Sequence, residues 1–134
     1  NIQQLIWDKL FINSSLSAVT GILQVKMGYI SANEHAWNLS CALIHEAAEA
    51  ARALGLCAEE EEIRERVRRT SLSSPEGITS ICADLRDGRR TEVDTISGSV
   101  VRAAQRLGIE VPCQRFVVDM IHAMEERGCQ VGSL

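Results

Sequence analysis

The sequence predicts an all-α domain of about six helices, and three of its features support this prediction. Aromatic residues make up only 4% of the chain whereas Ala and Leu are abundant, a composition that favours helices over a β-sandwich. Apolar residues recur at the three- and four-residue spacing of helices, and no long stretch alternates apolar and polar residues as a strand does. With 134 residues, 46% of them hydrophobic, the chain suits one domain with a buried core.

The first predicted helix runs from Ile2 to Lys26 and is expected to pack centrally. Gly28 is the expected stop signal, because glycine is common just beyond a helix end. The apolar positions that predict this helix are Ile2, Leu5, Ile6, Leu10, Leu16, Val19 and Leu23.

The second predicted helix begins at a capping box, in which Ser31 caps the helix and Glu34 follows three residues later. It runs to Leu54 and ends before Gly55. One apolar stripe along this helix is expected to face the core, and it comprises Trp37, Cys41, Ile44, Ala48, Ala51 and Leu54.

A third helix is predicted over the acidic-then-basic stretch from Glu59 to Arg69. Glu60 lies four residues before Arg64, and the pairs Glu62–Arg66 and Glu65–Arg69 repeat this spacing. Each such pair stabilises an exposed helix by about 0.2–0.5 kcal/mol. A docking patch for a partner is the alternative, but runs of charge usually mark a solvated face.

A polar connector is expected from Thr70 to Ser74, and the dipeptide Ser74-Pro75 is expected to open a fourth helix. That helix is predicted to run to about Asp87 and to stop at Gly88. A fifth helix is predicted to start at a Thr91 cap and to end near Gly108.

The sixth helix is predicted to open at Pro112, and the tail after Gly128 is expected to be frayed. Four of its side chains are expected to point toward the core. They are Phe116, Met120, Ile121 and Met124.

Composition and charge exclude several classes of function. The net charge of −4 argues against nucleic-acid binding, which needs a surplus of Lys and Arg. No apolar run approaches the roughly 20 residues that cross a bilayer. Five dispersed cysteines without a CxxC pair predict free thiols packed as small hydrophobes in a cytoplasmic protein. The chain begins with Asn1 and not with a Met, which suggests that it is a piece of a longer protein.

A metal site is not predicted. Cys41 and His45 have the i, i+4 spacing of two ligands on one helix face, but a stable site usually needs three or four ligands. No second pair accompanies them, and His45 is expected to be a polar residue of the core or its rim.

The first cluster of candidate site residues lies on the first predicted helix. Lys9, Asn13 and Ser17 follow one another at four-residue spacing, which stacks them on one face, and Thr20 lies close to that face. Buried polar groups need partners, so a polar ladder on an otherwise apolar helix is a candidate site. Spacing alone favours the simpler interpretation, in which this face is the wet side of an amphipathic helix.

The second cluster is the segment TSICADLRDGRRTEVDTISG, residues 79–98. Glu92 follows Thr91 at a predicted helix start, where a carboxylate suits the helix dipole. Ordinary capping, with Glu92 and Asp94 as dipole partners, explains the residue types. It leaves unexplained why Ser80 and the loop through Gly88 precede them so tightly.

At these residues the chain resembles the ketopantoate reductases, also called 2-dehydropantoate 2-reductases. WDKLFINSSLSAVTGI, residues 7–22, is similar to the family pattern W-x-K-L-x-x-N-x-x-x-N-x-L-T. Residues 79–98 are similar to S-S-M-x-Q-D-x-x-x-G-R-x-T-E-x-D-x-x-x-G, and GIEVPC, from Gly108, is similar to G-I-x-x-P. The resemblance covers residues 6–125, and the combination of the first two patterns is its most specific part.

The resemblance implies a two-domain enzyme in which an N-terminal Rossmann domain binds NADPH and an all-α domain closes over the substrate. It implies a fold like the C-terminal domain of 6-phosphogluconate dehydrogenase-like reductases. Lys9 matches the family's general acid, and Asn13 and Ser80 match substrate-binding residues. Glu92 matches a glutamate that contacts the substrate or the nicotinamide side of the cofactor, and it is expected to act with Lys9 in catalysis by orienting the lysine or binding a substrate hydroxyl.

Two positions depart from the family pattern, both on the pantoate-binding side. Ser17, still a candidate substrate contact, replaces a second asparagine, and Met27 precedes Gly28 where an asparagine is common. The resemblance therefore implies reduction of 2-dehydropantoate to pantoate in pantothenate biosynthesis, or reduction of another branched or bulky 2-oxoacid by a paralogous enzyme.

The chain has no G-x-G-x-x-G motif after a predicted strand, so the Rossmann domain and its NADPH site are expected outside residues 1–134. The isolated chain is accordingly predicted to be inactive. A non-catalytic interaction or dimerisation module descended from the same fold is the alternative. The changes at Ser17 and Met27 favour it, and the joint retention of four family residues opposes it: Lys9, Asn13, Ser80 and Glu92. The expected partners are a small 2-oxoacid, the Rossmann domain and a second copy in a homodimer.

Overall fold

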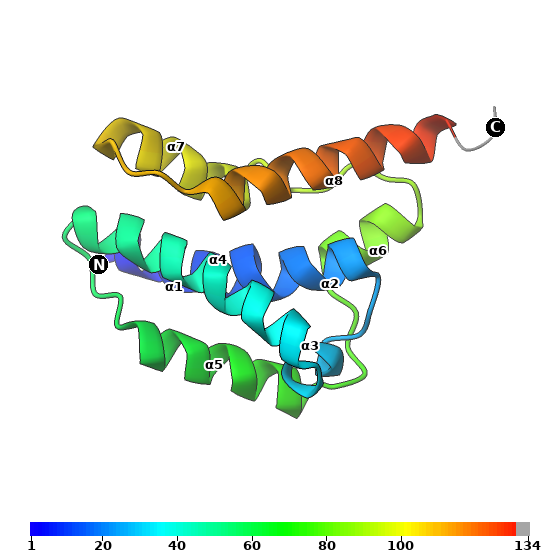
Figure 1. Cartoon of the computed structure of the whole chain (residues 1–134), viewed down its shortest axis with the longest axis horizontal. Coiled ribbons are helices and arrows are strands. Elements are labelled where there is room, and N and C mark those ends of the chain that lie inside the picture. Colours follow the sequence, from blue (N-terminus) through cyan, green and yellow to red (C-terminus); the bar gives the residue numbers. More distant parts are fainter. Residues whose placement is uncertain (131–134) are drawn as a thin grey trace.

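The computed structural model describes the backbone of residues 1–130 and the side chains of residues 1–128, and all its regular elements there are helices (Figure 1). This confirms the predicted all-α class. No helix among the described residues is long and apolar enough to cross a membrane. The chain begins with a long helical rod, described in the next paragraph. The later helices are α3 (Gly28–Ala32), α4 (Glu34–Ala53), α5 (Glu60–Ser73), α6 (Ser80–Arg86), α7 (Ser97–Leu107) and α8 (Pro112–Gln130).

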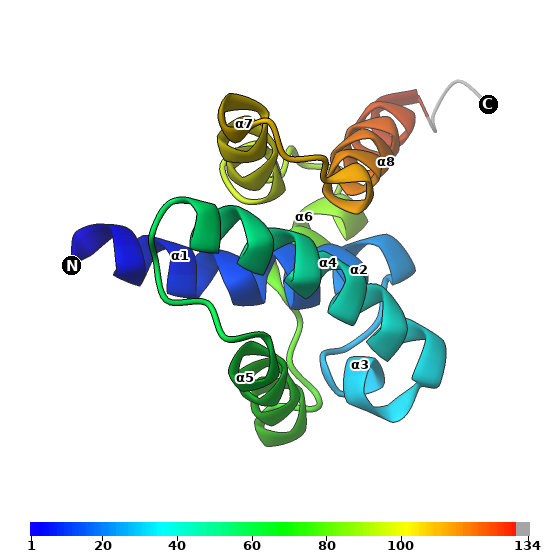
Figure 2. The same cartoon turned by 60° about the vertical axis from the view of Figure 1, so that its left-hand side comes forward.

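A continuous rod of helix, residues 2–23, forms the middle of the domain. It consists of α1 (Ile2–Ile12), the π-helical turn η1 (Asn13–Ser17) and α2 (Ala18–Leu23). The rod packs against α4 along its length, and α5 lies on one side of this pair while α7 and α8 lie on the other (Figures 1 and 2). The central position predicted for the first helix is therefore confirmed, and the rod with α3 to α8 makes seven helices where about six were expected.

The core lies where the rod meets α4 and the flanking helices. Small alanines on α4 allow the rod to approach closely, and Ala47, Ala48 and Ala51 are fully buried. The largest fully buried apolar side chains are Phe11, Leu16, Ile30, Ile44, Ile63, Ile81 and Ile121. Burying side chains of this size contributes about 1.5–3 kcal/mol each.

The first helix ends earlier than predicted, and its stop is not Gly28. Gln24 takes the left-handed conformation at the helix end, with φ 56°. Gly28 instead begins α3, where its N–H donates to the Pro75 carbonyl at 3.0 Å. A Cβ at this position would stand 2.8 Å from the Cβ of Pro75, so the glycine serves close packing.

The predicted capping box is also wrong, because tertiary contacts occupy its serine. Ser31 lies within α3 and shares a 2.8 Å hydrogen bond with the Ser71 hydroxyl. Asn33 caps α4 in its place, its side chain accepting from the Ala36 N–H at 2.9 Å. Ser71 also donates to the Met27 carbonyl at 2.7 Å, and α5 continues through the predicted connector to Ser73.

Two predicted helix starts shift toward the C-terminus. Ser74-Pro75 does not open a helix, because the carbonyls of Pro75 and Gly77 accept from the N–H groups of Gly28 and Met27. The helix begins instead at Ser80, and it ends before Gly88 as predicted. Thr91 does not cap the next helix: residues 92–96 form turns, and α7 begins at Ser97.

The last helix starts at Pro112 as predicted, but its core face differs. Ile121 is fully buried and Met120 and Met124 are half-buried, whereas Phe116 is 66% exposed. Gln114 takes an interior position instead, donating from its side-chain amide to the Leu43 carbonyl at 3.0 Å. The tail after Gly128 was expected to be frayed, and its residues 131–134 lie outside the described residues.

One of the three predicted charge pairs on α5 forms. Arg64 binds Glu60 at 3.2 Å, whereas Arg66 binds Asp8 of α1 at 3.8 Å instead of Glu62.

The described cysteines are free thiols, but only Cys82 is buried as predicted. Cys57 and Cys113 are exposed, Cys41 is half-buried, and the side chain of Cys129 lies outside the described residues.

Candidate functional site

The polar ladder of the rod runs from solvent into the core. Lys9 is exposed, Asn13 is half-buried, and Ser17 is buried with 7% exposure. The Ser17 hydroxyl donates to Asn13 Oδ1 at 3.3 Å, so these two side chains lie side by side. The wet-side interpretation therefore fits Lys9 but not the lower half of the ladder.

The ladder coincides with the π-helical turn, a feature that the sequence analysis missed. Within this turn the Ser15 hydroxyl donates to the carbonyls of Phe11 at 2.7 Å and Ile12 at 3.2 Å. Hydroxyl groups that compete for backbone carbonyls in this way loosen and bend helices. The signal was available in the run Asn-Ser-Ser-Leu-Ser, which is poor in strong helix formers. Single π turns occur often at functional sites.

A threonine pair joins the two sequence clusters. The hydroxyls of Thr20 on α2 and Thr79 at the start of α6 share a hydrogen bond of 2.8 Å. Gly21 permits this approach, since a Cβ there would stand 2.5 Å from Ile81 Cγ2. Ser80, which is exposed in the first turn of α6, directly follows Thr79, and its approach to Asn13 and Ser17 stays a prediction.

Glu92 lies exposed on the turn that precedes α7. The buried side chain of Val93 anchors this turn, and the Glu92 carbonyl accepts from the N–H groups of Thr95 and Ile96 at 3.0 and 3.1 Å. No hydrogen bond or ion pair among the described residues joins Glu92 to Lys9. Convergence of these two side chains on one substrate stays a prediction.

An apolar stripe continues the ladder toward the N-terminus of α1. Ile2, Leu5 and Ile6 are 77%, 65% and 48% exposed. Together with Lys9 they occupy positions i, i+3, i+4 and i+7, which form one helix face. Lys9 therefore stands at the edge of an apolar surface that the described residues leave uncovered.

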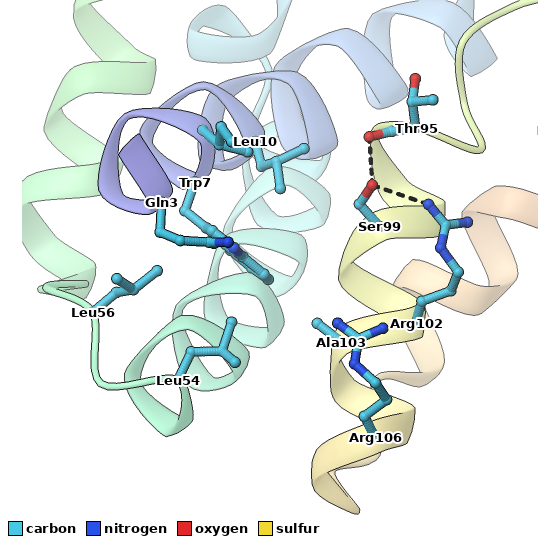
Figure 3. Close-up of a pocket in the computed structure, with 11 residues that line it drawn as sticks. Gln3, Trp7, Leu10, Leu54, Leu56, Thr95, Ser99, Arg102, Ala103 and Arg106 are labelled. Atoms are coloured by element: carbon cyan, nitrogen blue, oxygen red, sulfur yellow. Dashed lines mark hydrogen bonds between the residues drawn. The ribbon is translucent and has the colours of Figure 1, made fainter. Parts of the chain in front are cut away.

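Beside this stripe, a pocket of about 470 Å³ opens between α1 and α7 (Figure 3). Arg102 and Arg106 come from successive turns of α7, and neither forms an ion pair with a described residue. Guanidinium groups bind phosphate and carboxylate groups well, so these two could hold an anionic part of a ligand. Sequence reasoning missed them because they form no local motif. The lining comprises Gln3, Ile6, Trp7, Leu10, Leu54, Leu56, Thr95, Ser99, Arg102, Ala103 and Arg106.

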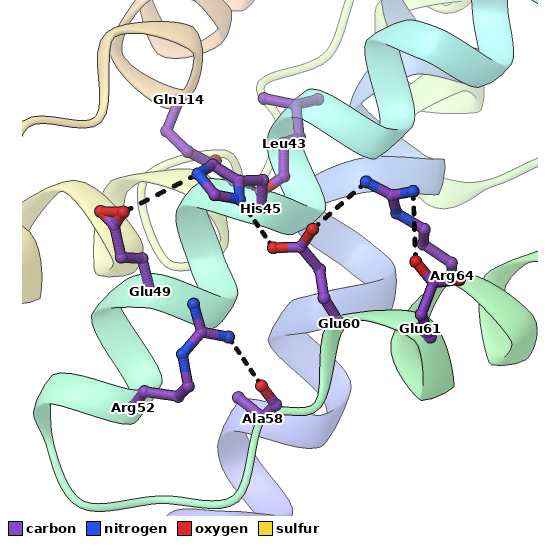
Figure 4. A network of polar contacts seen from close by, with 9 residues as sticks. All are labelled: Leu43, His45, Glu49, Arg52, Ala58, Glu60, Glu61, Arg64 and Gln114. Atoms are coloured by element: carbon purple, nitrogen blue, oxygen red, sulfur yellow. Dashed lines mark hydrogen bonds and ion pairs between the residues drawn. The ribbon is translucent and has the colours of Figure 1, made fainter.

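Three of the described thiols are poorly suited to nucleophilic chemistry. Burial raises the pKa of the Cys41, Cys82 and Cys113 thiols, which keeps them in the weakly nucleophilic protonated form. His45, offered above as a partner for Cys41, is exposed and binds Glu60 through Nδ1 at 2.7 Å (Figure 4). The described residues contain no group of three His, Cys, Asp or Glu side chains that could hold a metal ion.

The structure defines an all-α domain built around a central helical rod, and comparison with known proteins gives its family. A family model described as ketopantoate reductase PanE/ApbA C terminal matches residues 1–125. The chain belongs to this ketopantoate reductase C-terminal domain family. The resemblance drawn from the sequence motifs is thereby confirmed.

Individual relatives agree with this assignment. A 2-dehydropantoate 2-reductase of Archaeoglobus fulgidus is 28% identical over 93% of this chain and 42% of its own length. A PanE/ApbA family ketopantoate reductase from Ralstonia eutropha JMP134 superposes with a TM-score of 0.87 at 27% identity, over 96% of this chain and 43% of that one. A D-mandelate dehydrogenase solved with NADH and anilino(oxo)acetate has a TM-score of 0.88 at 23% identity, over 96% and 54%, and shares the fold. The chain thus spans less than half the length of the 2-dehydropantoate 2-reductases that it matches.

Proposed function

We propose that this chain is the substrate-side domain of an NADPH-dependent 2-oxoacid reductase, with 2-dehydropantoate as its substrate and pantoate as the product. The observation that carries the proposal is the ladder of Lys9, Asn13 and Ser17, which descends from an open apolar face into a π-helical turn. Family membership supports the class of reaction. The free thiols of the described residues suit a cytoplasmic enzyme.

The exposed stripe on α1 supports a covering surface above Lys9. Three large apolar side chains in a row are costly to leave in water, at roughly 25 cal/mol per Å². A Rossmann domain N-terminal to this chain, which binds the cofactor, is the proposed cover. Closing that surface over Lys9 would exclude water, and exclusion of water strengthens the interaction of an ammonium group with charge in the substrate.

The reaction suits the residue types of the ladder. NADPH, when bound, supplies the hydride that reduces the 2-keto carbon. The carbonyl oxygen then carries developing negative charge, and the Lys9 ammonium stabilises this oxygen and donates a proton to it. The product is a 2-hydroxy acid, and Lys9 regains its proton from solvent. The isolated chain, which lacks a dinucleotide motif, is proposed to be inactive.

The remaining candidates position the substrate. The Asn13 amide, the Ser17 hydroxyl and the Ser80 hydroxyl are proposed to bind its carboxylate and hydroxyl oxygens. Glu92 is proposed to accept a hydrogen bond from a substrate hydroxyl or from the nicotinamide side of the cofactor. Met27 packs its methyl group near Gly77 and offers no such hydrogen bond, which leaves a paralogous substrate, another bulky 2-oxoacid, as the second candidate.

Replacing Lys9 in the full-length protein tests the proposal. We expect Lys9→Ala to lower kcat by about 10²–10³-fold, as loss of one group that stabilises transition-state charge does, while NADPH affinity stays unchanged. Steady-state kinetics with 2-dehydropantoate and with bulkier 2-oxoacids measures the effect and ranks the substrates. Lys26→Ala is the matched control, because Lys26 ends in an exposed pair with Glu76.

Two outcomes would contradict the proposal. Equal activity of Lys9→Ala and Lys26→Ala would exclude a catalytic role for Lys9. Absence of 2-oxoacid reduction by the unaltered full-length protein would favour the non-catalytic interaction module instead.

A further inference from the structure

The turn that carries Glu92 is tied to α8 on both sides of that residue. On one side, Glu125 Oε2 accepts from both the N–H and the hydroxyl of Thr91, each at 2.7 Å. On the other side, Asp94 Oδ1 lies 2.7 Å from Nε2 of His122. His122 Nδ1 in turn lies 2.8 Å from Glu125 Oε1, so the two ties share one network.

The chemistry of this network favours a positive charge on its histidine. A carboxylate only accepts hydrogen bonds, and an imidazole that donates from both nitrogens is the protonated imidazolium. The hydrogen bonds to Asp94 and Glu125 accordingly raise the pKa of His122. Burial alone would raise the pKa of Glu125, but the hydrogen bonds from Thr91 and His122 outweigh it and lower that pKa.

Glu92 lies between the two ties, and its side chain makes few other contacts. Val93 is buried and anchors the backbone, whereas the Glu92 side chain is exposed and makes no hydrogen bond with a described residue. Thr91 further receives the Val93 N–H on its hydroxyl at 3.2 Å, which tightens the turn. The position of the Glu92 carboxylate therefore depends on the backbone of residues 91–94.

We propose that His122 and Glu125 are positioning residues, which clamp Thr91 and Asp94 to α8 and thereby set where the Glu92 carboxylate stands. This clamp rests on the proposed function, because it gives the reductase a role for Glu92. In this proposal His122 and Glu125 do not contact the substrate, and they act on Glu92 through the backbone of the turn. It also adds two residues that belong to none of the sequence motifs described above.

The clamp depends on pH, and the direction follows from the two shifts. The charged groups in contact with His122 are Asp94 from the turn and Glu125 from its own helix. Because the folded pKa of His122 is raised, its stabilisation is complete below the ordinary histidine pKa and is lost as pH rises through the folded value. Because the pKa of Glu125 is lowered, its share is complete above the ordinary glutamate pKa and is lost as pH falls through the folded value. The contribution of this network is therefore complete between the ordinary glutamate and histidine pKa values, and it is lost as pH rises through the folded pKa of His122 or falls through that of Glu125.

A second histidine provides a matched control. His45 on α4 binds Glu60 through Nδ1 at 2.7 Å and lies 3.8 Å from Glu49 through Nε2 (Figure 4). It therefore also stands between two carboxylates. Those carboxylates belong to α4 and α5, and neither belongs to the turn that carries Glu92.

The experiment compares His122→Gln, Asp94→Asn, Glu92→Gln and the control His45→Gln in the full-length protein. Amide exchange, corrected for intrinsic rates, reports protection of residues 91–96, and steady-state kinetics reports turnover. We expect His122→Gln to lose protection of these amides and its pH dependence, and to lower kcat about tenfold with less change in KM, since displacement of a catalytic group by about 1 Å can cost up to 10²-fold. Asp94→Asn keeps an acceptor oxygen and should show a smaller change of both kinds.

Each outcome decides between the clamp and the proposed function. Loss of kcat in His122→Gln that vanishes when Glu92→Gln is already present supports a clamp acting through Glu92. Protection of residues 91–96 equal in His122→Gln and His45→Gln overturns the clamp and leaves the reductase proposal intact. Lost protection with unchanged kcat overturns the positioning role. An unaffected kcat in Glu92→Gln instead contradicts the role of Glu92 in the proposed function, and the positioning proposal fails with it.

Discussion

Each half of the central rod departs from the usual distribution of side chains on one of its faces. In the first half, apolar Ile2, Leu5 and Ile6 are exposed, and in the second half hydroxyl-bearing Ser15 and Thr20 are fully buried. Both halves belong to one continuous helix that packs against α4. The difference teaches that helical spacing locates a face, whereas the neighbouring helices decide which face is covered.

Most of the buried hydroxyls in the second half have hydrogen-bond partners, although the Ser14 hydroxyl has none among the described residues. The Thr20 hydroxyl donates to the carbonyl of Leu16 at 2.9 Å and meets the hydroxyl of Thr79, and Ser15 bonds to the carbonyl of Phe11.

In the first half, the face with Ile2, Leu5 and Ile6 is uncovered, whereas the opposite face packs Trp7, Leu10 and Phe11 into the core. Gln4 donates to the Cys57 carbonyl and accepts from its N–H, both at 2.9 Å, which ties α1 to the loop before α5.

The largest expected effect compares two leucines of this rod. Leu16 is 1% exposed and Leu5 is 65% exposed. Leu16→Ala should lower the free energy of unfolding by about 2–5 kcal/mol, because it removes buried methyl groups and leaves a cavity. Leu5→Ala should change it by no more than about 0.5 kcal/mol, as surface substitutions do. Urea denaturation of the 134-residue chain measures both.

The same pair sharpens the comparison in the full-length protein. If a Rossmann domain covers α1, Leu5→Ala becomes destabilising there while remaining neutral in the isolated chain. A large cost of Leu5→Ala in the isolated chain would mean that another surface, such as a second copy, already covers this half of the rod.

A smaller effect is expected for the buried hydroxyl of Thr20. Thr20→Val keeps the shape of the side chain but leaves Thr79, which caps α6 through the Cys82 N–H, without its tertiary partner. We expect a loss of about 1–3 kcal/mol in unfolding free energy, the cost of unpairing a buried polar group. Thr70→Val is the control, because the Thr70 hydroxyl donates to the Arg66 carbonyl within its own helix. Equal losses in the two variants would show that the contact with Thr79 adds nothing.

The sequence predicted what local patterns determine. The all-α class, the end of α4 before Gly55, the start of α8 at Pro112 and the Glu60–Arg64 pair all depend on residues within a few positions of one another. The failures lie where distant residues meet. The local sequence makes Gly28 look like a helix stop, but in the structure this glycine allows close packing against Pro75.

The candidate site was predictable to a similar extent. Spacing put Lys9, Asn13 and Ser17 on one face, and the Ser17–Asn13 contact confirms this for Asn13 and Ser17. The depth of each residue was not predictable, because it depends on the helices that flank the rod. His122 follows no motif, and only the fold brings it to the turn that carries Glu92.

The smallest expected effect concerns the ion pair that links the first half of the rod to α5. Asp8 lies 3.8 Å from Arg66 and also accepts from the Gln4 side chain at 3.0 Å. Both charged side chains are about one-third exposed, so solvent screens the pair and Asp8→Asn should cost no more than about 1 kcal/mol. The amide retains an oxygen for Gln4, which limits the change to the charge. Denaturation at low and high salt should show the cost shrinking as salt rises. Glu61→Gln, at an exposed pair with Arg64 within α5, is the control and should cost less because it joins no two elements. A cost for Asp8→Asn well above 1 kcal/mol, insensitive to salt, would mean that this half of the rod is held by buried charge, and the contrast with the second half would fail.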